Sequence, residues 1–397
     1  MTLLCFFCNI RFSFITPYLE VSTNITFRKN EIHQLAFYWM IVLCTGLISG
    51  AYVLGKYFEE KSNCLFRLYL IISVGTVLSC LLLYFFNLQG NYITNYTLLL
   101  VTRFINVFFH PIAFITPALI LMKIYKGMQN IKISAYFILA AISGMQMSYF
   151  ATLYVAQNNL QLLCKLFLFA SILIVFIAVV SAPLLKILQN NLAISSNFRK
   201  ANPMSIVLSL LIGCVFNTGM RYHYFFIDRY VTDVLVIKHA PAFGYIFFYI
   251  TLSISLLVAA SFLKQENQQK LLTRSLISLL ILSMTSIILP IHSWINYAIY
   301  QIIFAFFLAI FLVPSLSIIF LMFKNNKLIF HGTMWFSTGY ALGNLASDWL
   351  TEKYGFFTQS NCLPMLPLVF GSLGCLAVLL YTTNNLSWPT LPKQKFP

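Results

Sequence analysis

Four basic residues lie inside long apolar segments of the sequence, where a charge is costly. They are Arg11, Arg103, Lys165 and Arg221. If these segments cross a membrane, a central arginine costs about 2.5 to 3.5 kcal/mol, so it needs water, a partner or a bound anion. Lys165 lies near the end of its segment, where its long side chain can reach the interface. The three arginines are therefore the first candidates for a binding site.

Polar and aromatic side chains accompany two of these arginines at helical spacing. Asn106 and His110 follow Arg103 at i+3 and i+7, on one helix face. The neighbours of Arg221 are Asn217, His223, Tyr224 and Asp228. Arginines suit carboxylates and aromatic faces suit planar rings, so the pattern predicts a cationic, aromatic-lined site. Alternatives stay open: Arg221 could pair with Asp228, Arg103 could extend to the outer membrane face, and the histidines could be satisfied core residues.

Two further segments carry candidate residues. Gln146 and Tyr149 share a helix face with Ser143 and are predicted to contact the substrate, unless Gln146 makes a helix–helix hydrogen bond instead. Thr16 and Pro17 lie at the outer end of the first apolar segment. Because proline weakens the backbone hydrogen-bond ladder, these two residues are predicted to shape a gate.

Membrane helices are the elements that must position these residues. The chain of 397 residues is 60% hydrophobic and 9% charged, with a mean hydropathy of +0.85, which excludes an ordinary soluble domain. Since a membrane helix needs about 20 apolar residues, the chain holds roughly a dozen and has no room for a soluble catalytic domain. The twelve predicted spans are 2–19, 35–56, 65–87, 97–122, 133–156, 161–185, 204–227, 241–263, 272–290, 294–323, 328–350 and 362–383.

Basic residues are distributed unevenly between the connections, and this predicts the orientation. Sixteen Lys and Arg fall in one alternating set of connections with the C-terminal tail, and five fall in the other set. Cytoplasmic loops carry the excess of basic residues in membrane proteins. Both termini are therefore predicted to be cytoplasmic, in a bacterial inner membrane or a plasma membrane.

The two halves of the chain repeat one another weakly. The matching residues are Arg11 with Arg221 in the first span of each half, and Phe108-Phe109 with Phe306-Phe307 in the fourth. We expect an N-terminal six-helix bundle over residues 1–188, a cytoplasmic linker over 189–203, and a C-terminal six-helix bundle with a short cytoplasmic tail over 204–397. This all-α arrangement, with 12 transmembrane helices in two six-helix pseudo-repeats, predicts the major facilitator fold. In that fold the first and fourth helices of each half line the central cavity.

The sequence offers no support for an enzyme, a cofactor or a metal site. Nine cysteines are scattered, and the Cys5/Cys8 pair has no further metal ligand near it. No paired catalytic residues share a span, and no phosphate-binding loop of the G-x-x-x-x-G-K-[ST] type is present, so ATP does not drive the chain directly. No carboxylate is placed near the middle of a span, which leaves histidine as the group able to couple transport to a proton. Exchange of one anion for another is at least as plausible.

The N-terminal segment resembles a known family of vitamin carriers. Its motifs are Arg11-Phe-Ser-Phe-Ile-Thr-Pro-Tyr-Leu19, Asn24-Ile-Thr26, Asn30-Glu-Ile32 and Tyr38. In order and in the Thr-Pro-Tyr-Leu core they resemble the opening of the reduced folate carrier and thiamine transporter family, where an Arg leads an R-P-S-E-P-F-x-T-P-Y-L run. The family's acidic residue in this helix is missing here, because Phe12-Ser13 replaces the Pro-x-Glu-Pro portion. The resemblance implies a vitamin carrier of the major facilitator fold.

Residue chemistry and family resemblance together predict a secondary active vitamin transporter. Folates carry two carboxylates and a planar pterin, which suit arginines and aromatic rings, whereas thiamine is a cation that an arginine cluster would repel. The chain is expected to import a folate-like or thiamine-like compound by alternating access, with an anionic substrate favoured. The alternative is a major facilitator exporter or organic-anion exchanger. The expected partners are the substrate, the lipid bilayer and a co- or counter-transported ion, and not nucleic acid.

Overall fold

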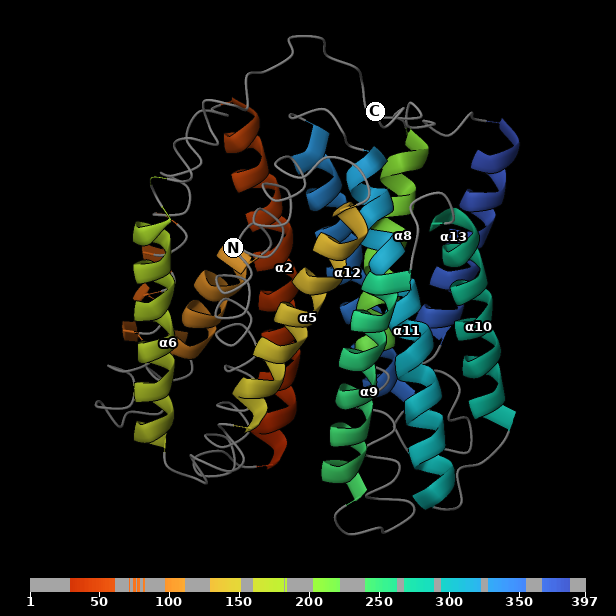
Figure 1. Ribbon diagram of the computed structural model, residues 1–397. Helices are drawn as coiled ribbons and strands as arrows, with labels where there is room; N and C mark the ends of the chain where they lie inside the picture. Colours follow the sequence, from red (N-terminus) through yellow and green to blue (C-terminus); the bar gives the residue numbers. More distant parts are fainter. Residues whose placement is uncertain are drawn as a thin grey trace.

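The described part of the chain is a bundle of long helices (Figure 1). The computed structural model describes residues 29–60, 97–110, 129–150, 160–181, 203–221, 240–262, 268–288, 294–322, 328–354 and 366–385, with residue 183 and a few residues between 71 and 82. The helices are α2 (Lys29–Glu60), α5 (Gln129–Phe150), α6 (Leu160–Val180), α8 (Pro203–Arg221), α9 (Ala240–Phe262), α10 (Gln268–Ile288), α11 (Trp294–Met322), α12 (Leu328–Tyr354) and α13 (Leu366–Asn385). Residues Thr97–His110 form a further apolar helix.

These helices overlap predicted spans, with ends that differ by up to six residues, and of span 97–122 the structure describes residues 97–110. Two described stretches, Pro203–Met220 and Ala298–Ile319, are long and apolar enough by themselves to cross a membrane. Span 2–19 lies outside the described residues, and only short pieces of span 65–87 lie within them. The count of twelve helices therefore stays a prediction.

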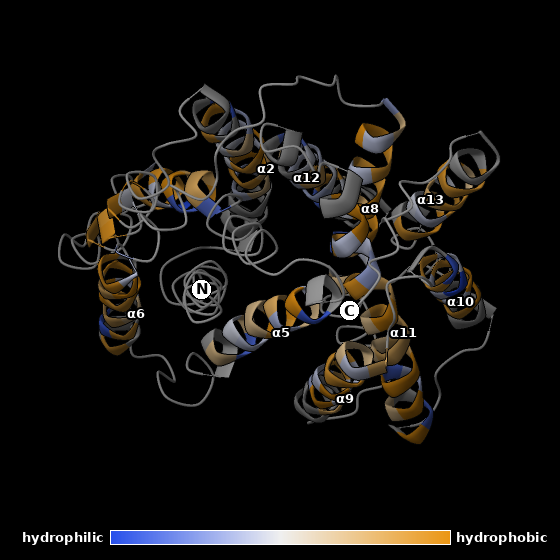
Figure 2. Cartoon of the chain, turned by 45° about the horizontal axis from the view of Figure 1, so that its top comes forward, coloured by the Kyte–Doolittle hydropathy of each residue, from blue (hydrophilic) through white to orange (hydrophobic). Residues whose placement is uncertain are grey.

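Large apolar side chains cover the outside of the bundle. Phe176 on α6, Ile254 on α9 and Phe370 on α13 are each more than half exposed. Figure 2 shows hydrophobic residues along most of the helices that are coloured there. Exposed apolar surface on this scale is unfavourable in water and favourable in lipid, so the surface chemistry agrees with a bilayer as the solvent.

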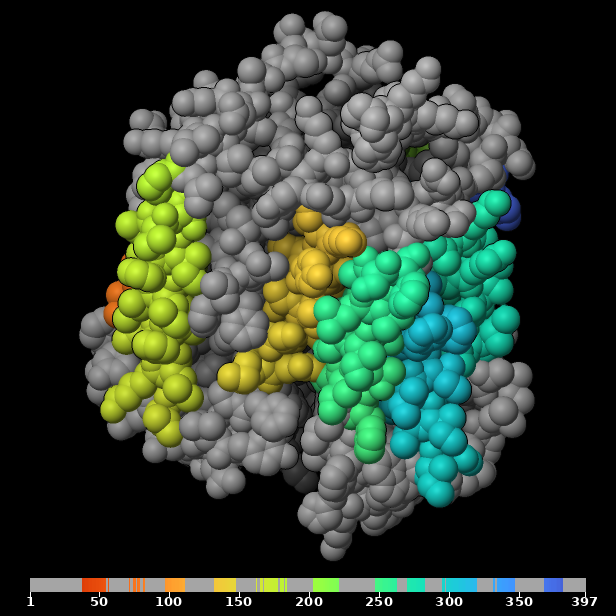
Figure 3. All heavy atoms as spheres, viewed as in Figure 1, coloured from red at the N-terminus to blue at the C-terminus, as the bar shows by residue number. Residues whose placement is uncertain are grey.

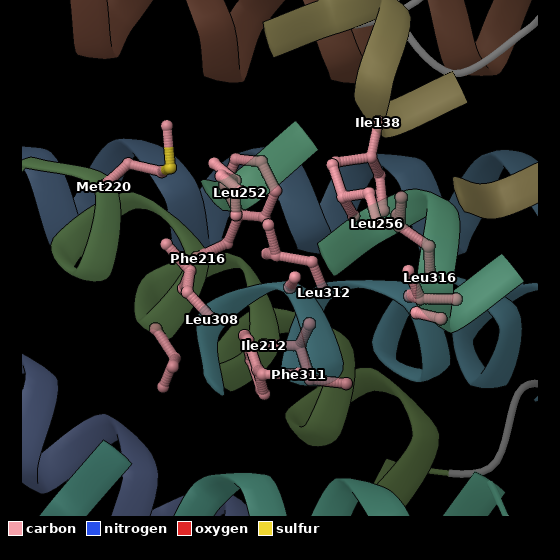
Figure 4. Packing of buried hydrophobic residues seen from close by; sticks show 14 of the residues in the cluster. Ile138, Ile212, Phe216, Met220, Leu252, Leu256, Leu308, Phe311, Leu312 and Leu316 are labelled. Carbon is pink, nitrogen blue, oxygen red and sulfur yellow. The ribbon is translucent and has the colours of Figure 1, made fainter. Parts of the chain in front are cut away.

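The main core joins α8, α9, α10, α11 and α13 with α5. Helix α11 packs against α9 and α10, and α8 packs against α12 and α13. In Figure 4, Leu308 and Leu312 of α11 lie among Phe216 of α8 and Leu252 of α9, while Ile138 of α5 approaches from the other side. All of these side chains are buried in one cluster, so van der Waals packing of apolar residues holds this part of the bundle together.

Early and late helices of the chain meet at two places. Helix α5 packs against α9 and α11, and Figure 3 shows the α5 and α9 surfaces side by side. Helix α2 packs against α12, where the thiol of Cys44 donates a hydrogen bond to the Ala341 carbonyl over 3.2 Å. Tyr52 and Trp335 meet edge to face there, with ring centroids 6.0 Å apart.

Glycine pairs allow the closest helix crossings. A Cβ added at Gly50 of α2 would overlap the carbonyl oxygen of Phe108, and one added at Gly339 of α12 would overlap that of Leu210. Gly46 and Gly343 lie one helical turn away in each helix, which gives the Gly-x-x-x-Gly spacing that lets membrane helices approach closely. The crossing at Gly46 and Gly50 fixes the Thr97–His110 helix against α2, and that helix carries Arg103.

Candidate functional site

The Thr97–His110 helix presents a buried polar face. Arg103 is 2% exposed, Asn106 is fully buried and His110 is 8% exposed. Thr102 is also buried, and its hydroxyl donates to the Leu98 carbonyl within the helix. The predicted face of Arg103, Asn106 and His110 is therefore directed into the protein. The alternative of an Arg103 side chain that extends outward to the membrane surface does not agree with this burial.

Arg103 lies over an aromatic ring of the neighbouring helix. Its guanidinium carbon is 4.9 Å from the centroid of Trp39, a buried residue of α2. A desolvated cation–π contact of this kind contributes about 2 kcal/mol, which offsets a large part of the cost of burying the charge. Trp39 belongs to the same helix as Gly46 and Gly50, so the close crossing and the cation–π contact depend on one interface.

This geometry is compatible with anion binding. A cation–π contact is directed at the face of the aromatic ring, and the in-plane N–H groups of a guanidinium are the groups that bind carboxylates and phosphates. Among the charged side chains described by the structure, Arg103 is the one that is buried; Lys56, Lys132, Lys165, Lys270 and Arg274 are exposed. Burial strengthens its attraction to an anion, because the surrounding medium screens less than water.

Gln146 is the other predicted site residue with a described side chain. It lies on α5 with intermediate exposure, and its Nε2 atom is buried without a hydrogen-bond partner in the part of the chain that is described. Its neighbour Met145 packs against the cluster formed by Leu43, Cys44, Leu47, Val107 and Ala341. Gln146 thus lies close to the interface that holds the Thr97–His110 helix, on a separate element.

The other predicted site residues stay predictions. Tyr149 and Arg221 fall within α5 and at the end of α8, but their side chains are outside the described set. Five more residues lie wholly outside it: Arg11, Thr16, Pro17, His223 and Tyr224. For the face around Arg221 one neighbour is placed: the Asn217 side-chain Nδ2 donates to the Tyr340 carbonyl of α12 over 2.6 Å. Asn217 therefore links two helices.

Sequence reasoning missed a buried carboxamide in α11. Gln301 is fully buried, and neither its Oε1 nor its Nε2 has a hydrogen-bond partner among the described residues. The signal was present in the sequence. Gln301 stands five residues before Phe306-Phe307, as Arg103 stands five residues before Phe108-Phe109, so the internal repeat aligns the two polar residues.

Similarity to known proteins is structural. No protein-family model matches the chain, and no curated protein matches its sequence. The chain is similar to the proton:xylose symporter XylE bound to 6-bromo-6-deoxy-D-glucose, with a TM-score of 0.69 and 11% identity over 97% of this chain and 94% of that one. A double tryptophan mutant of XylE gives a TM-score of 0.74 and 12% identity, covering 96% and 94%. The human organic anion transporter MFSD10 gives 0.67 and 12%, covering 96% and 97%.

These neighbours share an architecture with the chain over nearly its whole length. They are described as a proton:xylose symporter and an organic anion transporter. At 11 to 12% identity the likeness concerns the fold and leaves the substrate unassigned. The chain therefore has the major facilitator fold, an integral membrane fold that secondary transporters use.

Proposed function

We propose that this chain is a secondary transporter that imports a vitamin-like organic anion by alternating access, with Arg103 as an anion contact. The observation that carries the proposal is the burial of Arg103 on a polar helix face, over Trp39. A buried arginine lowers the stability of a membrane helix, and intramembrane charges of this kind typically mark a substrate or ion pathway.

An anionic, ring-containing substrate fits this chemistry best. The in-plane N–H groups of a guanidinium bind a carboxylate with two parallel hydrogen bonds, and aromatic side chains bind planar rings. The N-terminal motifs around Thr16 and Pro17 resemble those of folate and thiamine carriers, and of these two vitamins folate is the anion. A folate-like compound is therefore the preferred substrate and a thiamine-like one the second.

An organic-anion exporter or exchanger is the alternative function. One structural neighbour is described as an organic anion transporter, and the same buried arginine would serve that activity. Uptake and efflux assays separate the two directions of transport.

A histidine is the proposed site of ion coupling. His110 is buried one turn from Asn106, on the face that carries Arg103. Histidine is the side-chain type whose unperturbed pKa lies nearest to neutral pH, and one structural neighbour is described as a proton symporter. Protonation of His110 would add a second positive charge to this face and strengthen binding of an anion.

Side-by-side uptake of labelled reduced folate and labelled thiamine, into cells expressing the chain, tests the function. Folate uptake is expected, with a loss of about 100-fold in Arg103→Ala and a loss in Arg221→Ala, because each hydrogen bond to a charged group contributes about 1.5 to 3 kcal/mol. Lys165→Ala is the matched control, since it removes an exposed lysine, and it should transport normally.

Three results would change the proposal. Thiamine uptake that survives both arginine substitutions would retain the vitamin class and contradict the anion assignment. Uptake of neither vitamin, with efflux of an organic anion, would favour the exporter. Folate uptake that is unchanged in Arg103→Ala would remove Arg103 from the site.

A further inference from the structure

Arg103 and Gln301 occupy equivalent positions in two helices of similar design. Each residue precedes a Phe-Phe pair by five residues, and the two rings of each pair meet edge to face, with centroids 5.2 and 5.4 Å apart. The burial of neighbouring positions also agrees. Residues three, four and seven positions after Arg103 and after Gln301 are buried, while the residue directly after each is exposed.

The burial pattern shows where Gln301 points. The exposed side of α11 carries Ile299, Ile302 and Phe306, and the opposite side carries Gln301, Phe304 and Leu308. A Cβ added at Gly219 of α8 would lie 3.2 Å from the Cδ1 atom of Leu308, so this side of α11 faces α8. Gln301 therefore points toward the protein interior, on the same side of α11 as its contact with α8, and away from lipid.

Packing alone does not explain a glutamine at position 301. Both of its side-chain polar atoms are buried without a hydrogen-bond partner in the described part of the chain. Burying an unsatisfied amide lowers stability, and a leucine or methionine would fill the same volume without that penalty. Asn217, the matched case, is 1% exposed and is satisfied by the Tyr340 carbonyl. Gln301 therefore differs from Asn217 in having both side-chain polar atoms available for a hydrogen bond.

Aromatic rings stand on the helix turn beside Gln301. Tyr300 and Phe304 are stacked, with centroids 5.9 Å apart and 23° between the ring planes. Phe248 of α9 is stacked on Phe304 at 6.5 Å and 29°. A carboxamide offers one acceptor and two donors in a plane, which complements a heterocycle edge that carries an acceptor next to a donor. A planar ring of the lactam type carries such an edge, and its faces can pack against nearby aromatic side chains.

We infer that Gln301 is a second substrate contact, which binds the uncharged heterocyclic end of the ligand while Arg103 binds its anionic end. This inference rests on the proposed function. It assigns the two chemical parts of one substrate to equivalent positions in the two halves, a cation in one and a neutral carboxamide in the other. It predicts that the substrate is a compound with a lactam-edged ring and an anionic tail.

Inhibition of uptake by two substrate fragments tests the inference. The probes are a pterin, which has the lactam edge and lacks the tail, and p-aminobenzoylglutamate, which has the anionic tail and lacks the pterin. In Gln301→Met, inhibition by the pterin should weaken about tenfold relative to inhibition by the tail fragment, the equivalent of one net hydrogen bond. In Arg103→Lys, inhibition by p-aminobenzoylglutamate should weaken relative to inhibition by the pterin. An unchanged ratio in Gln301→Met would overturn the inference.

Thermal unfolding of the purified protein gives a readout that needs no transport. Gln301→Met should unfold at the same or a higher temperature than the parent chain, while the control Asn217→Leu should unfold at a lower one, because it loses a made hydrogen bond. Added pterin should stabilise the parent chain and not Gln301→Met. If the parent transports neither vitamin, the proposed function fails, yet pterin stabilisation confined to the parent would still support a ring site at Gln301. Equal pterin stabilisation of parent and variant, or none of either, would overturn it.

Discussion

The Thr97–His110 helix and α11 have similar burial patterns and opposite chemistry. At equivalent positions the first helix buries Arg103, Asn106 and His110, whereas α11 buries Gln301, Phe304 and Leu308. The first is held by the glycine crossing with α2 and by Trp39, and α11 is held by apolar packing against α9 and α10. One architecture can therefore bury a charged polar face in one helix and a mainly apolar face at the equivalent positions of another.

Stability and recognition are consequently assigned to different sets of residues. The large cluster around Leu308 and Leu312 contributes packing energy, and the polar face around Arg103 lowers stability while it provides binding chemistry. Substitutions of the apolar core residues of α11 should therefore act first on unfolding, and substitutions at the polar positions Arg103 and Gln301 should act first on transport. Four substitutions test this division, in order of expected effect.

Leu312→Ala should lower the stability of the apolar core around α11. Leu312 is fully buried in the α8, α9 and α11 cluster (Figure 4), so the change leaves a cavity and should cost about 2 to 5 kcal/mol of stability. Thermal unfolding in detergent measures the effect. Ile303→Ala removes an exposed side chain of the same helix and should change the unfolding temperature little. Equal effects of the two substitutions would show that α11 is not a packing helix.

Arg103→Gln should make the first helix chemically similar to α11 at the aligned position. Loss of the charge should lower uptake of labelled reduced folate by about 100-fold, because a charge-assisted pair contributes about 1.5 to 3 kcal/mol. The unfolding temperature should stay the same or rise, since a buried charge is removed. A fall in unfolding temperature with uptake retained would reverse the assignment of roles to the two helices.

Gly50→Ala should disturb the placement of Arg103 from the neighbouring helix. The added Cβ overlaps the Phe108 backbone carbonyl, so α2 and the Thr97–His110 helix must move apart, at a cost of about 1 to 3 kcal/mol. Uptake and unfolding temperature should fall together. The control is Gly374→Ala, whose Cβ would meet the flexible side chain of Leu211 at 3.2 Å and should be better tolerated. Equal tolerance at both positions would contradict the close crossing.

Trp39→Leu should have the smallest effect of the four. It removes the aromatic face under the guanidinium and keeps an apolar side chain, so it should lose about 1 to 2 kcal/mol of cation–π stabilisation. We expect a several-fold rise in the KM for folate uptake. Trp335→Leu is the control, because Trp335 packs edge to face against the ring of Tyr52. A larger KM change in Trp335→Leu than in Trp39→Leu would show that the ring does not position Arg103.

Helix positions and the polar face of Arg103 were predictable, because both depend on local sequence. Hydropathy located the described helices, with ends that differ by up to six residues where both ends are described, and a period of 3.6 residues placed Asn106 and His110 beside Arg103. Membership of the major facilitator fold was also predicted, from the span pattern and the repeat, and the structural neighbours confirm it. The two-bundle boundaries, the orientation and the residues near Arg11 and Arg221 remain predictions.

Contacts between helices were not predictable in the same way. Asn217 was expected on a polar face with Arg221, yet its side chain donates to a backbone carbonyl of α12. Gln301 was passed over because a single carboxamide in an apolar helix has no local signature of function. The internal repeat aligns it with Arg103, but its burial and its lack of a hydrogen-bond partner among the described residues come from the structure.

Local sequence was enough to locate the long apolar helices and to place an arginine and two polar neighbours on one helix face. Composition and helical periodicity are properties of short segments, so they need no knowledge of the fold. Only the tertiary structure decided that Trp39 lies over Arg103, that Gly50 sets their helices in contact, and that Gln301 is buried at the equivalent position. These contacts join residues far apart in the chain, and they depend on how closely and at what angle the helices cross.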